Sequence, residues 1–525
     1  MDIIENEKKK RTILYGLLVT VLVLIGVTYA YYRITKTQTN SNVIGTRTCL
    51  NTTLTEETSE IVLSDAFPIS DEDGLKQSPF TFTLTNNCDS YVKVTIALVS
   101  EYRTSTNTAY LKDNYVKSNL STKGTNDGSS VILSTLSLGE VDTNTQGYVL
   151  KTTGLKNKEA KSFDLRLWLD SETTNEQGLN KTWKGKIVVS VVAAEYVPTF
   201  AETILANNEV KAPITTPGAA ISTADEAEFA STEDDYGTSY YFRGAVTNNY
   251  VEFANKCWRI VRVGGDGSVK LILHNDNTAG VANPCDSANN SASAAFARYS
   301  GETYKSAFNA NYNDNAYVGF KYGTVGAGDY ALTHANTNKS TILTNLEAWY
   351  EKNNLKNYEK VIADTVWCND KTATDKSYDP WGWNPNGLGY GANKTYYGAT
   401  QRLVNTSGSA GGTGPSLKCN GELSKINSKV GLITADELAL AGYAYAKNNT
   451  TTYLQENATD TYWWSLSPNA FVGGRADVWD VCGSDGIFGD YFVNDTYGVR
   501  PSISLKSTTN VTGNGTSDSP FIIST

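Results

Sequence analysis

Residues 80–85 read Phe-Thr-Phe-Thr-Leu-Thr, and this strict alternation of apolar and polar side chains is typical of a β-strand with one buried face. The same period of two recurs at residues 92–98 and 163–169. Residues 186–192 are almost all apolar, which is typical of a strand buried on both faces. Many short strands with no helical period between them predict an all-β sandwich over residues 33–197.

An uncharged apolar segment, residues 12–32, precedes this domain and follows four cationic residues at positions 8–11. About 20 apolar residues are enough to cross a bilayer as a helix, and the cations before it hold the amino end in the cytoplasm. We therefore expect a cytoplasmic basic tail over residues 1–11. The helix over 12–32 is either a transmembrane anchor or a secretory signal that is cut after Ala30.

Either alternative places the bulk of the chain outside a bacterial cell membrane, as a single-pass membrane protein or, after cleavage, as a secreted one. The composition fits that location. The 525 residues carry a net charge of −10 with 40% hydrophobic residues, which indicates a globular protein and excludes a nucleic-acid partner, because phosphate binding needs a basic face.

Seven cysteines follow the apolar segment, and outside the cell paired thiols form disulfides. Cys49 and Cys88 are the only ones within the expected sandwich domain, residues 33–197, so we expect them to pair. Cys368 and Cys419 flank a loop rich in Gly and Asn and form the second expected pair. Three more remain, and one of them must stay free or bond in trans: Cys257, Cys285 and Cys482.

Residues 198–238 carry Pro, Ala, Ser, Thr and acidic residues, which predicts a semi-extended linker, with a short helix near its start as an alternative. A second domain is expected over residues 239–525. It begins with a β-hairpin over 257–273, continues with helices capped by Ser340 and by the capping box at 434–437, and returns to short strands. This order predicts an α+β domain.

Residues 26–32, Gly-Val-Thr-Tyr-Ala-Tyr-Tyr, and residues 42–46, Asn-Val-Ile-Gly-Thr, resemble the start of TasA/camelysin-type bacterial surface and matrix proteins. The resemblance covers about the first 200 residues. It implies a jelly-roll-like sandwich, cleavage after Ala30, and strand exchange between subunits of a homo-oligomer. Since the HExxH zinc motif is missing from the sequence, we do not extend a peptidase activity to this chain.

A second resemblance rests on four segments in order: 462–468 (Tyr-Trp-Trp-Ser-Leu-Ser-Pro), 476–479 (Ala-Asp-Val-Trp), 483–486 (Gly-Ser-Asp-Gly) and 497–501 (Tyr-Gly-Val-Arg-Pro). They resemble bacterial domains of unknown function with a C-type-lectin-like, formylglycine-generating-enzyme-like core. The resemblance covers about residues 240–525. It implies a small twisted sheet with two helices and an open binding face made of loops.

An aromatic loop at residues 379–391 is the main candidate binding element, because aromatic rings beside amides suit sugars and peptides. The alternative is a loop that folds back onto its own domain. Trp463 and Trp464 are adjacent on a predicted strand and should face opposite sides, so one of them could be exposed. The candidate ligand-binding residues are Trp381, Trp383, Tyr390 and Trp464.

Two residues of the closing segments are expected to be structural, Trp479 and Arg500. Arg500 should form an ion pair or bind carbonyl oxygens, with Asp477 or Asp485 as possible charge partners.

Enzyme chemistry has little support in the sequence. His274 and His334 are the only histidines, and neither has a Ser, Cys or metal-ligand neighbour at a recognisable spacing. Residues 71–74, Asp-Glu-Asp-Gly, could bind calcium, but without a full twelve-residue loop a solvated turn is the better interpretation. We therefore expect no enzyme activity, no metal and no cofactor.

The leading hypothesis is a non-enzymatic bacterial cell-surface protein, in which a β-sandwich stalk presents a lectin-like head to an extracellular glycan or protein. The alternative is a secreted matrix or fibre subunit that assembles through its sandwich. A hydrolase that depends on His274 or His334 is a more distant third.

Overall fold

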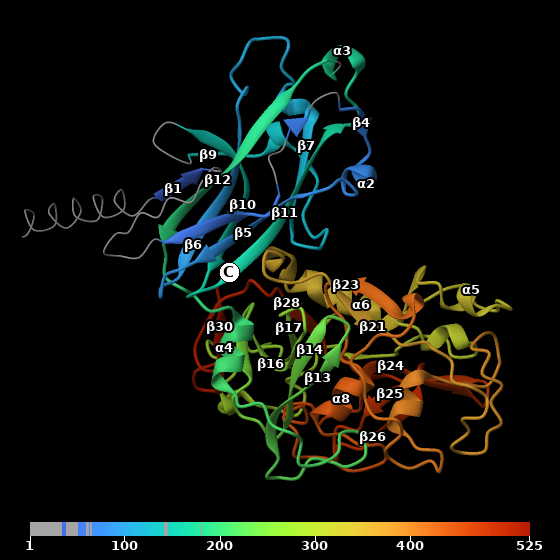
Figure 1. Cartoon of the computed structure of the whole chain (residues 1–525). Coiled ribbons are helices and arrows are strands. Elements are labelled where there is room, and N and C mark those ends of the chain that lie inside the picture. The colour runs from blue at the N-terminus through green and yellow to red at the C-terminus, as the bar shows by residue number, and fades with distance from the viewer. Residues whose placement is uncertain are drawn as a thin grey trace, which may run out of the picture. The chain divides into compact units, whose positions relative to one another are not determined.

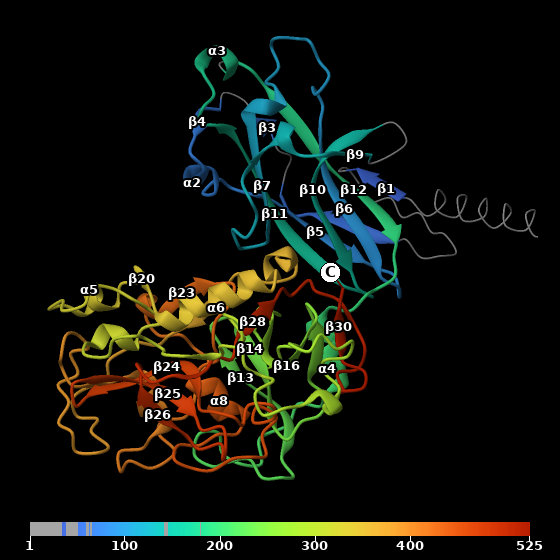
Figure 2. The same cartoon turned by 180° about the vertical axis from the view of Figure 1, so that it is seen from behind.

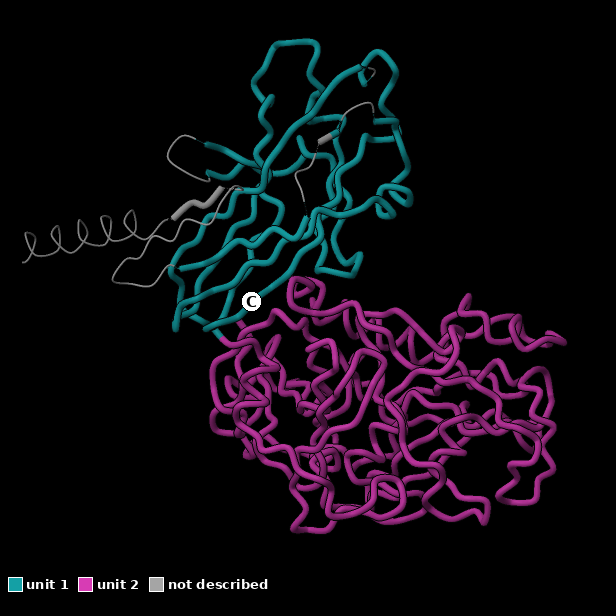
Figure 3. Tube along the Cα trace, in the orientation of Figure 1, with its two compact units in different colours: residues 1–197 teal, residues 198–525 magenta. Residues whose placement is uncertain are grey.

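The computed structural model describes residues 34–37, 51–58, 62–63, 66–140, 145–178 and 180–524. The chain forms two compact units, residues 1–197 and 198–525 (Figure 3). The predicted helix over 12–32 lies outside the described residues, as does Cys49 of the predicted Cys49–Cys88 pair. Within the described ranges, no helix has the length and apolarity needed to span a membrane.

Unit 1 contains two six-stranded, largely antiparallel sheets in the part of the chain that the structure describes. In the first, the order is β1 (Ile34–Thr37), β12 (Trp183–Ala193), β6 (Val92–Ser100), β10 (Gln146–Leu155) and β9 (Leu138–Glu140), with β3 (Val62–Leu63) on β12. In the second, it is β2 (Thr52–Glu56), β5 (Phe80–Asn86), β11 (Ala160–Asp170), β7 (Val116–Thr122) and β8 (Val131–Ile132), with β4 (Pro68–Ile69) on β11.

The two sheets of unit 1 share one hydrophobic core, to which β5, β7 and β11 contribute from one sheet and β6, β10 and β12 from the other. Phe82 on β5 lies directly opposite Phe163 on β11, with ring centroids 5.6 Å apart. The alternation at residues 80–85 therefore has the predicted cause, because the apolar side chains of that stretch are buried in this core.

Unit 2 has two larger sheets, coloured green to red along the chain in Figures 1 and 2. One contains β13 (Ala227–Asp234), β14 (Gly237–Gly244), β16 (Lys256–Val263), β15 (Tyr250–Phe253), β30 (Phe521–Ile523) and β29 (Val511–Thr512), with β17 (Val269–Asn275) between β16 and β28 (Ser502–Leu505). The other contains β18 (Lys305–Ser306), β27 (Tyr497–Gly498), β24 (Trp463–Val472), β25 (Arg475–Val481) and β26 (Phe488–Phe492), with β22 (Thr395–Tyr396) on β24.

Two short strand pairs complete the strands of unit 2: β19 (Lys321–Tyr322) with β20 (Asn338–Lys339), and β21 (Thr365–Cys368) with β23 (Lys425–Ser428). The α-helices of both units are α2 (Asp71–Gly74), α3 (Asn175–Gly178), α4 (Phe200–Asn207), α5 (Tyr330–His334), α6 (Thr341–Lys352), α7 (Gly398–Leu403) and α8 (Ala435–Ala441). The 3₁₀ turns are η1 (Asp113–Tyr115), η2 (Leu133–Thr135), η3 (Ser287–Asn289), η4 (Asn315–Val318), η5 (Leu355–Tyr358) and η6 (Glu422–Ser424).

The helix signals in the second half of the sequence are confirmed. Ser340 caps α6 by accepting a hydrogen bond from the Leu343 amide, and α6 buries its apolar face in the core of unit 2. Thr434 and Glu437 form the predicted capping box, and α8 ends at Gly442.

Residues 198–238, for which we expected an extended linker, belong to unit 2 and contain β13. The alternative of a short helix near their start is confirmed by α4, which begins with a capping box of Thr199 and Glu202. Of the acidic residues at 225–235, three are buried, at positions 226, 228 and 234. Glu226 accepts a hydrogen bond of 2.6 Å from Arg243 Nε, and both side chains are fully buried. An acid this deep is tolerated because a buried cation neutralises it.

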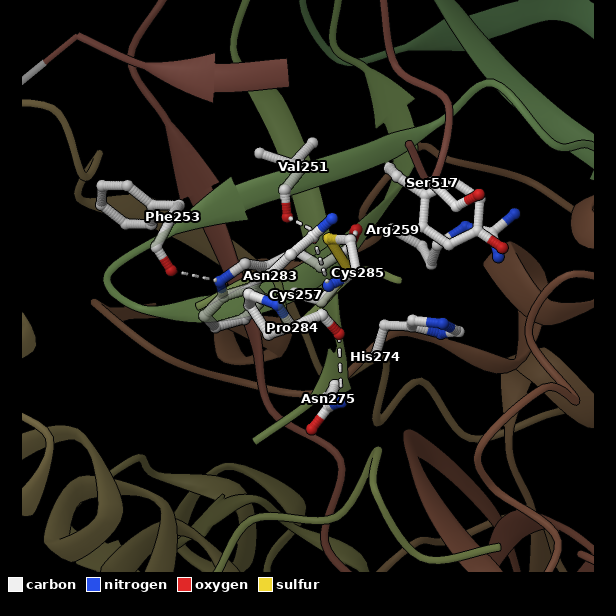
Figure 4. Close-up of a disulfide and its surroundings, with 12 residues drawn as sticks. Val251, Phe253, Cys257, Arg259, His274, Asn275, Asn283, Pro284, Cys285 and Ser517 are labelled. Atoms are coloured by element: carbon white, nitrogen blue, oxygen red, sulfur yellow. Dashed lines mark hydrogen bonds between the residues drawn. A yellow bond between two sulfur atoms is a disulfide. The ribbon is translucent and has the colours of Figure 1, made fainter. Parts of the chain in front are cut away.

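Two disulfides are present among the described residues. The predicted Cys368–Cys419 pair is confirmed, and Cys257 on β16 pairs with Cys285 in the loop that follows β17 (Figure 4). Cys482 is a buried free thiol. Disulfides of this kind indicate an oxidising compartment.

Candidate functional site

A pocket with a volume of about 820 Å³ opens beside the β24–β25–β26 part of the second sheet of unit 2. Its volume lies within the range of small-ligand sites. The pocket has a wall from the aromatic loop, a floor from the sheet and an opposite wall from the β24–β25 turn and β26. The lining residues are 382–384, Lys394, Val472, Gly473, Arg475, Asp477 and 490–492.

Strand pairing brings two acids onto the floor of this pocket. Asp477 on β25 lies opposite Phe492 on β26, and Trp479 lies opposite Asp490. Because alternate side chains of a strand share a face, Asp477 and Asp490 are diagonal neighbours on one side of the sheet. No sequence motif joins them, since they come from two strands of a hairpin.

The environment of the two acids favours their protonated forms. Asp477 is only 4% exposed. Burial, reinforced by the charge of Asp490, raises the pKa of Asp477 to about 9. Asp490 is partly buried, and desolvation raises its pKa to about 6. Together the two carboxyl groups hold one proton and one negative charge near neutral pH.

The wall of the aromatic loop is fixed by hydrogen bonds to one carboxylate. The amides of Trp383 and Asn384 donate to the two oxygens of Asp379, at 2.8 and 2.9 Å. Gly382, with a φ of +72°, allows the turn between them. Trp383 is 40% exposed. Lys394 Nζ donates a hydrogen bond of 2.9 Å to the backbone carbonyl oxygen of Trp383.

The opposite wall carries a cation and an aromatic ring. The Arg475 guanidinium lies over the ring of Phe492, 4.3 Å from its centroid. The neighbouring Tyr491 projects from the other face of β26, where its ring packs on those of Tyr462 and Tyr497. The pocket lining therefore combines the exposed Trp383 ring, the Phe492 ring and two carboxyl groups.

The aromatic-loop wall and the sheet floor of the pocket are held in place by different kinds of bond. Cys368 and Cys419 close a covalent ring that contains the whole aromatic loop. The floor belongs to the hydrogen-bonded sheet, and β22 of the ring pairs with β24 of that sheet.

The structure brings Trp383 to the pocket but not the other three predicted ligand-binding residues. Trp381 is partly buried and contacts Tyr445, with ring centroids 5.7 Å apart. Tyr390 is partly buried and does not line the pocket. Trp464 is 1% exposed, and its indole N–H donates to Ser306 O at 2.8 Å, so its ring is not open to a ligand.

Trp464 was expected to be exposed if Trp463 was buried. The two rings do face opposite sides of β24, but both sides of this strand are covered, and Trp463 is fully buried as well. Trp479 is fully buried against Phe488, with centroids 4.7 Å apart, as its structural role requires.

Arg500 binds carbonyl oxygens, one of the two roles expected for it. Its Nε donates to Leu273 O at 3.0 Å, and Nη1 donates to Leu454 O. The expected ion pair with Asp477 or Asp485 is wrong: neither acid contacts it among the described residues, and the guanidinium instead lies over the Trp463 ring, 4.9 Å from its centroid.

The chain matches no protein-family model, and no curated protein matches it at a significant level. The resemblances to TasA/camelysin-type proteins and to C-type-lectin-like domains therefore stay predictions. The geometry of the pocket carries the functional argument.

Both histidines lie away from the pocket. His274 is fully buried on β17, and burial holds its pKa well below the ordinary value. His334 ends α5, and burial lowers its pKa to about 3, while its Nε2 contacts Gly389 O at 2.7 Å. Residues 71–74 form the short helix α2, in which Asp71 pairs with Lys117. No group of three or more acids, histidines or cysteines in the described ranges is arranged to hold a metal ion.

A second cavity, of about 290 Å³, lies beside the Cys368–Cys419 disulfide and is lined by charged side chains. These charges are paired with one another. Glu437 contacts Lys270 at 2.6 Å and Arg262 at 2.9 Å, and although burial alone would raise the pKa of Glu437, the two cations hold it at about 2. Arg402 joins Asp370 and Asp436 in the same way. These charged side chains of the second cavity therefore already have partners of opposite charge.

Sequence reasoning missed Asp477, Asp490, Arg475 and Tyr491 as pocket residues. One signal was present: Asp477-Val-Trp-Asp480 places charged residues on both faces of a strand that was expected to be buried.

Proposed function

We propose that this chain is a non-enzymatic bacterial cell-surface protein whose second unit, a C-type-lectin-like head, binds an extracellular glycan in the pocket beside Trp383. The first unit is a jelly-roll-like β-sandwich stalk, and the apolar segment at residues 12–32 attaches or exports the protein. The observation that carries the proposal is that the exposed Trp383 side chain and two carboxyl groups line one pocket of about 820 Å³.

This arrangement suits a sugar. An aromatic ring offers a flat apolar surface to the C–H face of a pyranose, and carboxyl groups accept or donate hydrogen bonds to its hydroxyls. Because the Trp383 backbone is held by Asp379, the ring needs little reordering to bind. The absence of turnover is also part of the proposal, and the burial of His274 and His334 away from the pocket supports it.

The test is a glycan array probed with the full-length protein and with the variant Trp383→Ala. We expect binding to a restricted set of glycans and its loss in the variant. Retention of every signal by Trp383→Ala, or no binding to any glycan, would refute the proposal.

A further inference from the structure

The two acids on the pocket floor differ from the paired acids of unit 2, such as Glu226 with Arg243 and Glu437 with Lys270. Asp480 on β25 is also buried without an ion pair among the described residues, but it does not line the pocket. Asp477 Oδ1 is buried and accepts no hydrogen bond from the described residues. Neither Asp477 nor Asp490 forms an ion pair with a described Lys or Arg.

The two cationic side chains that line the pocket, Arg475 and Lys394, contact other groups of its walls. The Arg475 guanidinium is stacked on Phe492, and Lys394 Nζ donates to Trp383 O. A buried carboxyl group without a partner is costly, and a bound ligand that supplies a donor or a positive charge removes that cost.

We propose that the pocket binds a glycan that carries a free amine, with the ammonium group placed against Asp477 and Asp490 and the sugar ring stacked on Trp383. This inference rests on the proposed function and narrows it to a substrate class. Carboxylates next to aromatic faces are the combination that recognises ammonium groups, since both attract positive charge.

The size of the pocket favours an amino sugar over a lysine side chain. Trp383 presents an exposed ring at the pocket, and a volume of about 820 Å³ exceeds what one alkyl chain fills. The charge of the two carboxyl groups also matches that of the proposed ligand. Near neutral pH the two carboxyl groups hold one negative charge between them, which equals the charge of one ammonium group.

The experiment is isothermal titration of the full-length protein with two probes, a tetramer of β-1,4-linked glucosamine and the corresponding tetramer of N-acetylglucosamine. The two differ in charge and share the sugar backbone. We expect the free amine to bind at least tenfold more tightly. Asp477→Asn and Asp490→Asn should each reduce that preference to threefold or less.

The matched control is Asp89→Asn, which removes one negative charge from an acid of unit 1 that is 87% exposed and should leave the preference unchanged. Near-UV circular dichroism verifies that each variant is folded. Having two independent acid variants keeps the test valid if one of them fails to fold.

Equal affinity for the two tetramers would overturn the inference while leaving a glycan-binding function intact. Failure of both tetramers to bind while other glycans bind on the array would overturn it too, and failure of every glycan would also refute the proposed function. A lysine-containing peptide that binds more tightly than the glucosamine tetramer, and loses binding on acetylation, would overturn the assignment to an amino sugar.

Discussion

The indole ring of Trp383 stacks on the phenol ring of Tyr396, with centroids 5.7 Å apart and planes at 26°. Tyr396 is fully buried and belongs to β22, which pairs with β24. A loop residue is therefore held in place by the sheet. The ring of Trp383 stays available on its exposed side, and its position does not depend on the loop backbone alone.

The first prediction concerns Trp383→Ala. Removal of a stacking ring costs about 1.4 kcal/mol, so we expect about tenfold weaker binding of the glucosamine tetramer with little change in stability, because the ring is partly exposed. The comparison variant is Trp464→Ala, in a fully packed site, which should cost about 3–5 kcal/mol of folding free energy. Calorimetry and thermal melts measure both effects, and unchanged affinity in Trp383→Ala would contradict the stacking role.

The second prediction concerns the pH dependence of binding. The pKa of Asp490 is about 6 in the free protein, and an ammonium ligand needs its ionised form. Lowering the pH through 6 protonates Asp490, while the amines of the tetramer gain protons over the same range. The affinity of the wild type for the glucosamine tetramer, relative to that of Asp490→Asn, should therefore be about tenfold lower at pH 5 than at pH 7.

Several charged or titratable groups surround Asp490 in this test: Asp477, Asp480, Arg475, Lys394, Tyr396 and Tyr445. Burial raises the pKa of Tyr396 and of Tyr445, so both stay neutral between pH 5 and 7. Burial keeps the pKa of Asp477 and of Asp480 above that range. A ratio of wild-type to Asp490→Asn affinity that is the same at pH 5 and pH 7 would assign the titration to another group.

The third prediction concerns stability and Asp477. Its folded-state pKa of about 9 exceeds the ordinary value of 3.8, so the folded protein binds more protons than the unfolded chain between those values. The free energy of unfolding contributed by Asp477 therefore falls as pH rises from about 4 to 9. Asp477→Asn has no carboxyl group that must take up a proton on folding, so it should be about 1–3 kcal/mol more stable than the wild type at pH 8, and nearly equal to it at pH 4.

Urea denaturation at the two pH values measures this difference, with Asp89→Asn as the control for loss of one charge. A variant that is less stable than the wild type at pH 8 would show that Asp477 has a stabilising partner after all.

The fourth prediction concerns the Cys368–Cys419 disulfide. It joins residues 51 positions apart, and opening a ring of that length costs about 4 kcal/mol in the chain-entropy account. The double variant Cys368→Ser/Cys419→Ser should lose about that much stability and bind the glucosamine tetramer more weakly. Cys482→Ala removes a thiol that is outside any disulfide and should leave binding unchanged. Equal melting temperatures for the double variant and the wild type would contradict the prediction.

Local features of the fold were predictable because their causes are local. The alternation at residues 80–85, the cap at Ser340 and the capping box at Thr434 each depend on neighbours within a few positions. The Cys368–Cys419 pair was predictable from the loop that it closes.

Features that depend on distant partners were not predictable. The acids of residues 198–238 looked solvated because nothing local indicated that Arg243 would bury and neutralise Glu226. The fate of Trp464 depended on what covers each face of β24. The pocket joins Trp383 to Asp477 and Asp490 through the pairing of strands far apart in the chain, so the aromatic loop could be named as a candidate but not its floor.

Part of the pocket lining belongs to a ring closed by a disulfide, and part belongs to a sheet. This division determines which lining residues can change independently of one another. Residues 382–384 and Lys394 belong to the ring, whereas Asp477 and Asp490 belong to paired strands. Substitutions at residues 382–384 can therefore change one wall of the pocket without altering β25 or β26, the two strands that carry its acidic floor.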